Sequence, residues 1–231
     1  MDAPLTLAAD DVAACLDSHG HADLGPVFDA ETCARIAGLY ERDALFRSRI
    51  DMRRHGFGSG EYKYFADPVP DAIAAARATL YARLVGVANA WETALGSGRQ
   101  FPDTHAGFLA RCHAEGQRRP TPLLLRYREG DYNCLHQDLY GPLVFPLQVV
   151  VLLSDTAGFE GGQFVLTEQR PRMQSRAEVV PLRRGHAVAF AVNERPRRGS
   201  RGVYRTRQRH GVSRLLKGER MTLGLIFHDA S

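Results

Sequence analysis

Residues 125–138 read LRYREGDYNCLHQD, a run typical of a β-strand, then a turn, then a histidine and an aspartate two positions apart. In a strand, side chains at i and i+2 point to the same face, so His136 and Asp138 can project into one cavity. A neutral imidazole and a carboxylate together suit a divalent transition metal. A polar strand end can carry the same pair, so the interpretation as a metal site depends on a third ligand further along the chain.

The sequence on the C-terminal side of Pro120 predicts a β-rich core. Short runs of β-forming residues follow one another, and clusters of Gly, Pro, Asp and Asn separate them. This spacing is typical of an all-β sandwich or barrel. The predicted strands are residues 122–128, 145–154, 162–168, 175–182, 186–192, 201–212 and 220–229.

The sequence on the N-terminal side predicts mostly helices, at residues 10–20, 29–42, 70–95 and 103–115. Asp29 is placed to cap the second helix, and Pro70 lies at the start of the third. Residues 49–65 are rich in glycine, arginine and aromatic side chains without a helical period, which predicts a loop or a hairpin. We therefore expect an α+β chain that is mainly β, with a helical support over residues 1–118 and a β-domain over residues 119–231.

The composition is ordinary for a globular protein, with 44% hydrophobic and 24% charged residues in a chain of 231. No apolar run approaches the roughly 18 residues needed to span a bilayer, and the acidic start does not resemble a secretory signal. The four cysteines are scattered without a C-x-x-C pair, so neither a zinc knuckle nor a disulfide framework is predicted. These features lead us to expect a cytoplasmic protein with no membrane partner.

The positive charge of the chain, +4 in total, comes almost entirely from arginine. Lys63 and Lys217 are the only lysines. Arginine forms bidentate contacts with carboxylates and phosphates, so this usage suits an anionic partner. A bias in the base composition of the genome would produce the same usage.

A third metal ligand has to come from a later strand, and the candidates are His186, His210 and His228. Two histidines and one carboxylate form the facial triad of non-haem iron(II) oxygenases. Many of these enzymes use 2-oxoglutarate, a dianion whose far carboxylate needs a fixed cation, best supplied by arginine. His210 is followed ten residues later by Arg220 and then by Thr222 on the same strand face. Neither of the other two histidines has a cation at that distance, so the spacing selects His210.

Together these segments resemble the 2-oxoglutarate- and Fe(II)-dependent oxygenase superfamily, most closely its prolyl-hydroxylase-like and AlkB-like branches. LRYREGDYNCLHQD matches the strand and turn before the first ligand in those enzymes, and FEGGQFVL a segment after the first two ligands. The other matches are RHGVS, whose histidine lies 72 residues after Asp138, and GERMTLGLIFHD. The resemblance covers roughly residues 120–229 and implies a double-stranded β-helix, or jelly roll, with the metal at its mouth.

The resemblance also implies a role for each matching residue. Arg220 would bind the C5 carboxylate of 2-oxoglutarate with help from Thr222, and Tyr127 would contact the same cosubstrate. The implied reaction consumes O2, hydroxylates a C–H bond and releases succinate and CO2. Arg209 departs from the small or apolar residue that often precedes the last histidine, and its role stays open. The implied iron ligands are His136, Asp138 and His210.

Residues near the first ligand and in segment 49–65 are candidates for contact with the substrate. Asn133 and Tyr132 lie on the approach to the metal, although they can equally form the turn that ends a strand. His55 belongs to a loop that would cover the substrate or would only connect two elements. Aromatic side chains of this loop could stack on bases. They are Phe57, Tyr62, Tyr64 and Phe65.

Residues 194–210 form a basic stretch that leads directly into the last proposed ligand. The stretch holds seven arginines. A strand would place three of them on one face, where they could follow a phosphate backbone or form an ordinary solvated face. These three are Arg205, Arg207 and Arg209.

Three functions fit these features. The first is oxidative demethylation of alkylated single-stranded or damaged nucleic acid, which the basic stretch, the aromatic loop and the HQD tripeptide support. The second is hydroxylation of a protein or small molecule by a prolyl-hydroxylase-like enzyme, which YREGDYNCLHQD and GGQFVL fit at least as well. The third is a cupin-like metal-binding module without catalysis, which would need neither Arg220 nor turnover of 2-oxoglutarate.

Overall fold

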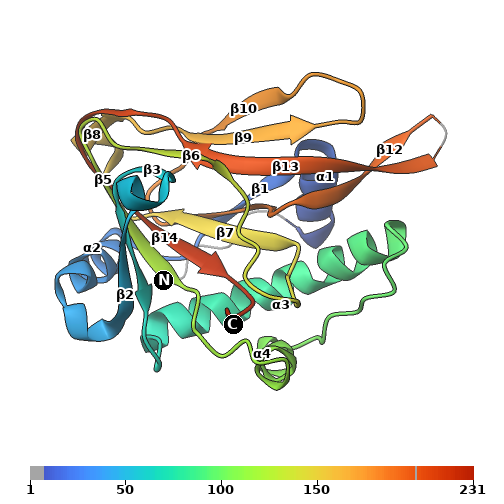
Figure 1. Ribbon diagram of the computed structural model, residues 1–231, viewed down its shortest axis with the longest axis horizontal. Coiled ribbons are helices and arrows are strands. Elements are labelled where there is room, and N and C mark those ends of the chain that lie inside the picture. The colour runs from blue at the N-terminus through green and yellow to red at the C-terminus, as the bar shows by residue number, and fades with distance from the viewer. Residues whose placement is uncertain (1–7, 201) are drawn as a thin grey trace.

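Two antiparallel β-sheets form the centre of the computed structural model, which describes residues 8–200 and 202–231 (Figure 1). In spatial order the larger sheet contains β1 (His21–Pro26), β11 (His186–Ala191), β7 (Leu147–Leu152), β14 (Leu215–Ile226), β5 (Leu123–Arg128), β4 (Glu61–Phe65) and β2 (Phe46–Asp51), and β8 (Phe159–Gly161) pairs with β14. The smaller sheet contains β10 (Arg176–Val180), β9 (Phe164–Gln169), β13 (Gly202–Val212), β6 (Tyr132–His136) and β3 (Gly58–Ser59), and β12 (Glu194–Gly199) pairs with β13. The predicted jelly-roll class, mainly β with a helical support, is confirmed.

Four α-helices and four short 3₁₀ helices complete the described part of the chain. The Asp29 carboxylate accepts a hydrogen bond of 2.7 Å from the backbone N–H of Thr32, so the predicted cap of the second helix is present. The α-helices are α1 (Ala9–His19), α2 (Ala30–Gly38), α3 (Asp71–Ala94) and α4 (His105–Ala114). The 3₁₀ helices are η1 (Leu39–Glu41), η2 (Asp43–Leu45), η3 (Met52–His55) and η4 (Thr156–Gly158). None of the helices in these described ranges has the length and hydrophobicity needed to cross a membrane.

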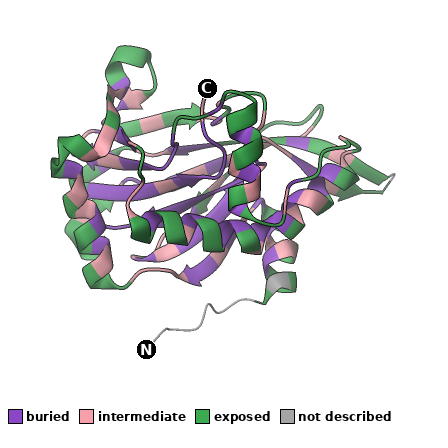
Figure 2. Cartoon of the chain, turned by 90° about the horizontal axis from the view of Figure 1, so that it is seen from below, coloured by how far each residue is buried: buried purple, intermediate pink, exposed green. Residues whose placement is uncertain are grey.

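Side chains alternate along each strand, so one face of the larger sheet packs in the hydrophobic core and the other lines a cavity. Leu223 and Leu225 of β14 belong to the main hydrophobic cluster, together with Leu80 and Leu84 of α3. This helix therefore covers the outer face of the larger sheet, and Figure 1 shows it running beneath the strands. Figure 2 shows the same division, with buried residues along the strands and exposed residues on the outer sides of the helices. The opposite face of β14 points toward the smaller sheet.

The N-terminal part of the chain contributes strands that its helical pattern does not predict. β1 pairs with β11 at one edge of the larger sheet, and β4 pairs with β5 near the other edge. Residues 49–65 contain β4 and the second half of its antiparallel partner β2, so a hairpin, one of the two structures predicted there, is present. The sequence HADLGP of β1 is short and contains both Gly and Pro, so only the pairing with β11 defines it as a strand.

Candidate metal and cosubstrate site

A cavity of about 340 Å3 lies between the two sheets. Its floor is the inward face of β14 and β5, where Thr222 lies opposite Leu125 and Gly224 lies opposite Leu123. Phe164 of β9 lines it from the smaller sheet. Most of these lining side chains are apolar, so polar groups that point into the cavity stand out.

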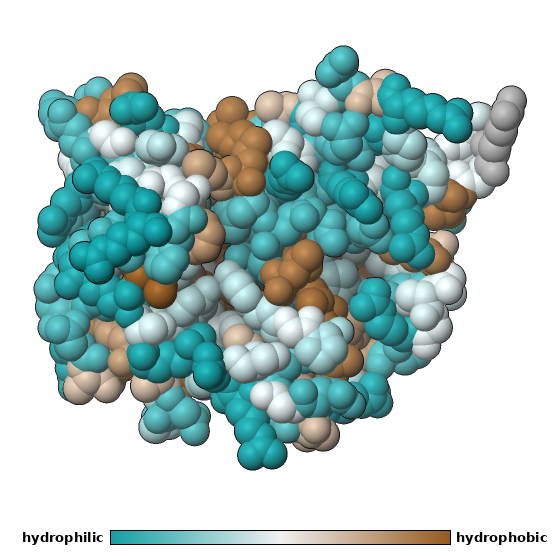
Figure 3. Space-filling model, viewed as in Figure 1, coloured by the Kyte–Doolittle hydropathy of each residue, from teal (hydrophilic) through white to brown (hydrophobic). Residues whose placement is uncertain are grey.

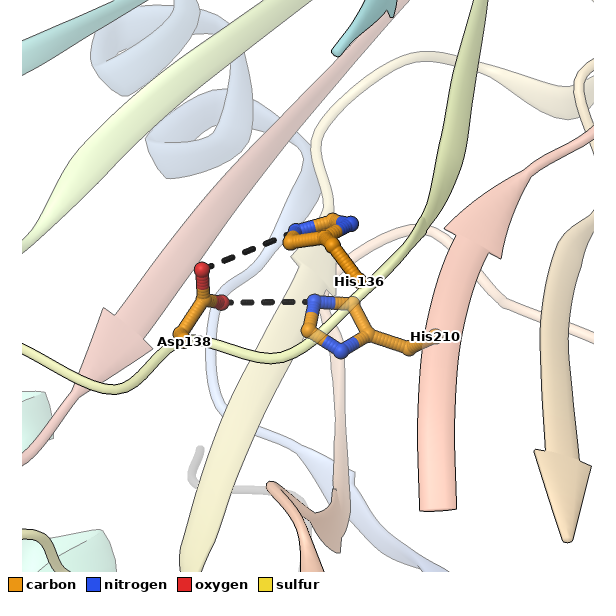
Figure 4. Close-up of side chains that lie close together, drawn as sticks. All are labelled: His136, Asp138 and His210. Carbon is orange, nitrogen blue, oxygen red and sulfur yellow. Dashed lines mark ion pairs between the residues drawn. The ribbon is translucent and has the colours of Figure 1, made fainter. Parts of the chain in front are cut away.

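His136, Asp138 and His210 converge at this cavity (Figure 4). The pairing of β13 with β6 sets His210 directly opposite His136, and Asp138 follows two residues after β6 ends. One ligand atom from each residue can be chosen so that all lie within 4.8 Å of one another. The Asp138 carboxylate faces both rings, with Oδ2 at 3.3 Å from His210 Nε2 and Oδ1 at 3.6 Å from His136 Nε2. Two imidazoles and one carboxylate are therefore close enough to bind one ion.

Each imidazole ring is oriented by different contacts. His136 Nδ1 lies 2.8 Å from the carbonyl oxygen of Cys134, which can only accept, so Nδ1 carries the proton and Nε2 has a free lone pair. The His210 ring packs against Phe190, with ring centroids 4.8 Å apart, and against Phe164 at 6.2 Å. Within the described residues, His210 Nδ1 is buried without a hydrogen-bond partner. His210 Nε2 lies 3.1 Å from Gln148 Nε2 and 3.3 Å from Asp138 Oδ2. Packing and these polar contacts together orient His210, whereas a backbone hydrogen bond orients His136.

Two neutral side chains donate hydrogen bonds to the Asp138 carboxylate. The Tyr140 hydroxyl donates to Oδ1 at 2.6 Å, and Gln148 Nε2 donates to Oδ2 at 2.9 Å. Burial alone would raise the pKa of Asp138, but the hydrogen bond with His210 and the electrostatic interactions with His210 and His136 outweigh it and hold the pKa well below its usual value. Asp138 is therefore present as a fixed carboxylate near neutral pH.

Arg220 lies at another part of the same cavity and is almost completely buried, with 2% of its surface exposed. It sits opposite Tyr127 in the β14–β5 pair, and its guanidinium carbon is 5.7 Å from the centre of the Tyr127 ring. Its Nη1 has no hydrogen-bond partner among the residues that the structure describes. Burial lowers the pKa of Arg220 to about 10, because the apolar surroundings disfavour the charged form. Thr222 lines the cavity beside it.

The substrate-contact candidates from the sequence divide into two groups. Asn133 lines the cavity and donates a hydrogen bond of 3.3 Å to the Tyr127 hydroxyl. Phe57 and the two tyrosines Tyr62 and Tyr64 also line it, so the aromatic segment does reach the site. His55 does not line the cavity but directly precedes the lining residue Gly56 in the sequence. Its ring stacks on Phe57, with ring centroids 5.3 Å apart.

The remaining candidates lie away from the cavity. Phe65 is fully buried in the main core, stacked on Phe46, so it is not available for a base, and that expectation is corrected. Tyr132 is exposed, outside the cavity lining, near the guanidinium of Arg214. Arg207 and Arg209 are exposed on the face of β13 opposite to the buried His210.

Several arginines of the basic stretch form ion pairs within the protein. Arg205 forms an ion pair of 2.8 Å with Glu194 in the neighbouring strand, and Arg207 approaches the same carboxylate at 3.5 Å. Arg195 is completely buried and pairs with Glu168. Arg201 lies outside the described residues. The free positive charge of the stretch is therefore smaller than its seven arginines suggest.

Tyr140 and Gln148 are site residues that the sequence analysis did not single out, although each carried a signal. Tyr140 lies two positions after Asp138, the same spacing that links Asp138 to His136. Gln148 is the one polar residue in the otherwise apolar run LQVVVL of β7. A polar side chain in the middle of a fully buried strand needs a partner, and here its partner is the carboxylate.

The match to known proteins covers most of the chain. Residues 60–230 match a family described as an oxygenase catalysing oxidative methylation of damaged DNA. Two uncharacterized proteins from two strains of Mycobacterium tuberculosis are each 48% identical over 168 residues, which is 72% of this chain and 72% of each relative. These relatives share a large part of the sequence but carry no described activity.

Solved structures with a similar fold have low sequence identity to this chain. A prolyl hydroxylase from Trichoplax adhaerens, in complex with a peptide fragment of hypoxia inducible factor, aligns with a TM-score of 0.60 at 13% identity, over 96% of this chain and 89% of that one. An oxidoreductase of the 2OG-Fe(II) oxygenase family from Burkholderia pseudomallei aligns with a TM-score of 0.53 at 18% identity, over 98% and 94% of the two chains. The predicted superfamily fold is therefore confirmed. The protein belongs to the oxygenase family that matches residues 60–230, and it is an oxidoreductase built on the fold of the 2-oxoglutarate- and Fe(II)-dependent oxygenases.

Proposed function

We propose that this oxygenase binds Fe(II) through His136, Asp138 and His210, and binds 2-oxoglutarate through Arg220 and Thr222. The supporting observation is the buried Arg220 guanidinium, which has an unpartnered Nη1 in the same cavity as the three converging metal-ligand side chains. An unpaired buried cation costs several kcal/mol. A dianionic ligand that reaches both the metal and Arg220 would remove this penalty.

The protein side chains in this proposal bind, orient and exclude water. Arg220 and Thr222 would hold the far carboxylate, with Tyr127 packed against the guanidinium. The apolar walls, including Phe164, limit the access of water to the reacting atoms. Iron(II), 2-oxoglutarate and O2 together supply the oxidation, in which the cosubstrate is converted to succinate and CO2 and a substrate C–H bond becomes C–OH.

We propose further that the substrate is an N-methyl group on a damaged nucleic-acid base. The family description, the aromatic lining by Tyr62 and Tyr64, and the exposed arginines of β13 support this choice. Hydroxylation of an N-methyl carbon gives an N-hydroxymethyl product, whose C–N bond breaks to release formaldehyde and the unmethylated base. An enzyme of this kind must receive an unstacked base, which fits a site at the bottom of a cavity.

The decisive experiment is an anaerobic titration with Fe(II) and 2-oxoglutarate, followed by a turnover screen in air. Methylated oligonucleotides and proline-containing peptides would be compared, with succinate and formaldehyde measured separately. We expect both products in equal amounts with a methylated oligonucleotide. Succinate released with a peptide alone would overturn the nucleic-acid substrate, and no succinate under any condition would overturn the cosubstrate assignment.

The variant Tyr140→Phe is expected to weaken Fe(II) binding by about 10- to 100-fold, the usual effect of removing a hydrogen bond to a metal ligand. The ring remains, but the hydroxyl that donates to Asp138 Oδ1 is lost. Isothermal titration with Fe(II) under anaerobic conditions measures the change. Tyr132→Phe removes the same group from an exposed tyrosine and is expected to bind iron as the wild type does. Equal affinity in all three proteins would show that Tyr140 does not position the carboxylate.

The double variant Arg207→Ala/Arg209→Ala is expected to bind a single-stranded oligonucleotide more weakly. The slope of log affinity against log salt should fall by roughly 1.4 if each side chain contacts one phosphate. Fluorescence anisotropy at several salt concentrations gives both values. Arg35→Ala/Arg42→Ala removes the same number of exposed charges near α2 and serves as control. An equal loss in both double variants would indicate only the general effect of net charge.

A further inference from the structure

An aromatic pair stands at the opening of the cavity. Phe57 lines the cavity, yet 46% of its surface is exposed, and the ring of His55 is stacked on it with 20° between the ring planes. Leu135, which also lines the cavity, is 44% exposed. On the face drawn in Figure 3, hydrophobic side chains appear as small islands within a mostly hydrophilic surface. Exposed large apolar side chains beside a cavity are candidates for contact with a ligand.

Hydrogen bonds hold the backbone of Phe57 in place, although 46% of the residue's surface is exposed. The Phe57 N–H donates to the carbonyl oxygen of Met52, which is fully buried, and the Phe57 carbonyl accepts from the N–H of Cys134 at 2.8 Å. Gly58 has a φ of +128° and packs so closely that an added Cβ would collide with the carbonyl oxygen of Tyr132. The aromatic face is therefore presented by a rigid support, which lowers the entropy lost when a ligand binds.

The charges around this pair indicate the chemistry of its partner. Arg53 and Arg54 precede it, and their side chains are 73% and 82% exposed. Arg53 Nε donates a hydrogen bond of 2.8 Å to the neutral hydroxyl of Ser59. The ion-pair distances to carboxylates are long, at 3.7 Å between Arg53 and Asp131 and 3.6 Å between Arg54 and Asp51. Such long, exposed pairs leave most of the positive charge available. A partner that presents flat rings and negative charges together is a single nucleic-acid strand.

We propose that His55 and Phe57 form a stacking platform for the unpaired base next to the one that enters the cavity, with Arg53 and Arg54 near the backbone phosphates. This inference deepens the proposed function and depends on it. A platform of this kind requires a strand whose neighbouring bases are free, because paired bases are already stacked within the duplex. The enzyme would therefore select single-stranded regions through the bases that flank the methylated one.

The test is binding of a fluorescein-labelled single strand with one N-methylated adenine, measured by anisotropy at constant salt. Phe57→Ala is expected to reduce the affinity by about 10-fold, the order of one lost stacking contact. Phe57→Trp should retain the affinity, whereas Phe57→Leu should lose it, because leucine keeps apolar area without an aromatic face. Val179→Ala shortens an apolar residue on β10 that is 58% exposed and lies outside the cavity lining, and it serves as control. Circular dichroism and thermal unfolding check that each variant folds.

Abasic strands identify the contact itself. Removal of the base on one side of the methylated one should weaken wild-type binding about as much as Phe57→Ala does, and should have no further effect on that variant. Additive losses, unchanged binding of Phe57→Ala, or wild-type affinity of Phe57→Leu would each overturn the platform alone. Absence of any oligonucleotide binding by the wild type, with binding of a peptide, would overturn the proposed function and this inference with it.

Discussion

Replacing Asp138 with alanine is expected to reduce Fe(II) affinity by more than about 100-fold and to abolish succinate release. The carboxylate lies between the two imidazoles, at 3.3 Å from His210 Nε2 and 3.6 Å from His136 Nε2. Among the described residues, no other Asp or Glu lines the cavity and could replace it. The loss of Fe(II) affinity should exceed the 10- to 100-fold effect that is usual when a residue hydrogen-bonded to a metal ligand is removed. Anaerobic titration with Fe(II) measures the affinity, and succinate is measured in air with 2-oxoglutarate in excess.

Two controls separate loss of the ligand from loss of the fold. Asp155→Ala removes a carboxylate that caps η4 outside the cavity, and it should bind iron normally. Asp138→Asn keeps the size of the side chain and one oxygen but removes the charge, and it should bind iron more weakly than the wild type. A folded Asp138→Ala variant with unchanged iron affinity would remove Asp138 from the proposed site.

Replacing Arg220 with methionine is expected to abolish 2-oxoglutarate binding and, in the ligand-free protein, to increase stability. Burial lowers the pKa of Arg220 from its usual value to about 10, so the folded state disfavours the charged form. Both values lie above neutrality, so the full penalty is present at pH 7 and is lost only as the pH rises through the folded-state pKa. The lowering of the Arg220 pKa on folding corresponds to a penalty on the order of 3 kcal/mol. The free energy of unfolding of Arg220→Met should be larger by about this amount.

Chemical unfolding with and without 2-oxoglutarate tests both parts of this prediction. The wild type should gain about 2.7 kcal/mol when the ligand is present at 100 times its dissociation constant, and Arg220→Met should gain nothing. Arg128→Met, on the paired strand β5, replaces an arginine whose side chain is 63% exposed, and its stability should change by no more than about 0.5 kcal/mol. A variant that is less stable than the wild type and still responds to 2-oxoglutarate would contradict the assignment of Arg220.

Patterns of short range in the sequence predicted a large part of the structure. The Asp29 cap, the helical spacing of residues 70–95 and the alternation in the later strands all depend on neighbouring residues, and the structure has these elements. Alternation also predicted that Arg207 and Arg209 share a face, which they do. The same alternation turns them away from His210, so they lie outside the cavity.

Other features depended on contacts between distant parts of the chain. β1 becomes a strand because β11 offers its edge, more than a hundred residues later. Gln148 reaches Asp138 because β7 pairs with β14 beside the floor of the cavity. Phe65 enters the core although its neighbour Tyr64 lines the site. The periodicity of the sequence around these residues does not predict such features, because each depends on which elements pack together.

The jelly-roll class was implied by the resemblance to the 2-oxoglutarate- and Fe(II)-dependent oxygenases. The sequence by itself determined the types of most elements, the β-rich core after Pro120 and the set of three candidate metal ligands followed by an arginine. It did so because periodicity, turn residues and the spacing between His210 and Arg220 are properties of the chain alone. The tertiary structure decided which face of each strand meets the cavity, which groups hold the Asp138 carboxylate, and which aromatic ring stays exposed at the opening. These depend on sheet pairing and packing between residues far apart in sequence, where burial and hydrogen bonding select one arrangement among several that the local pattern allows.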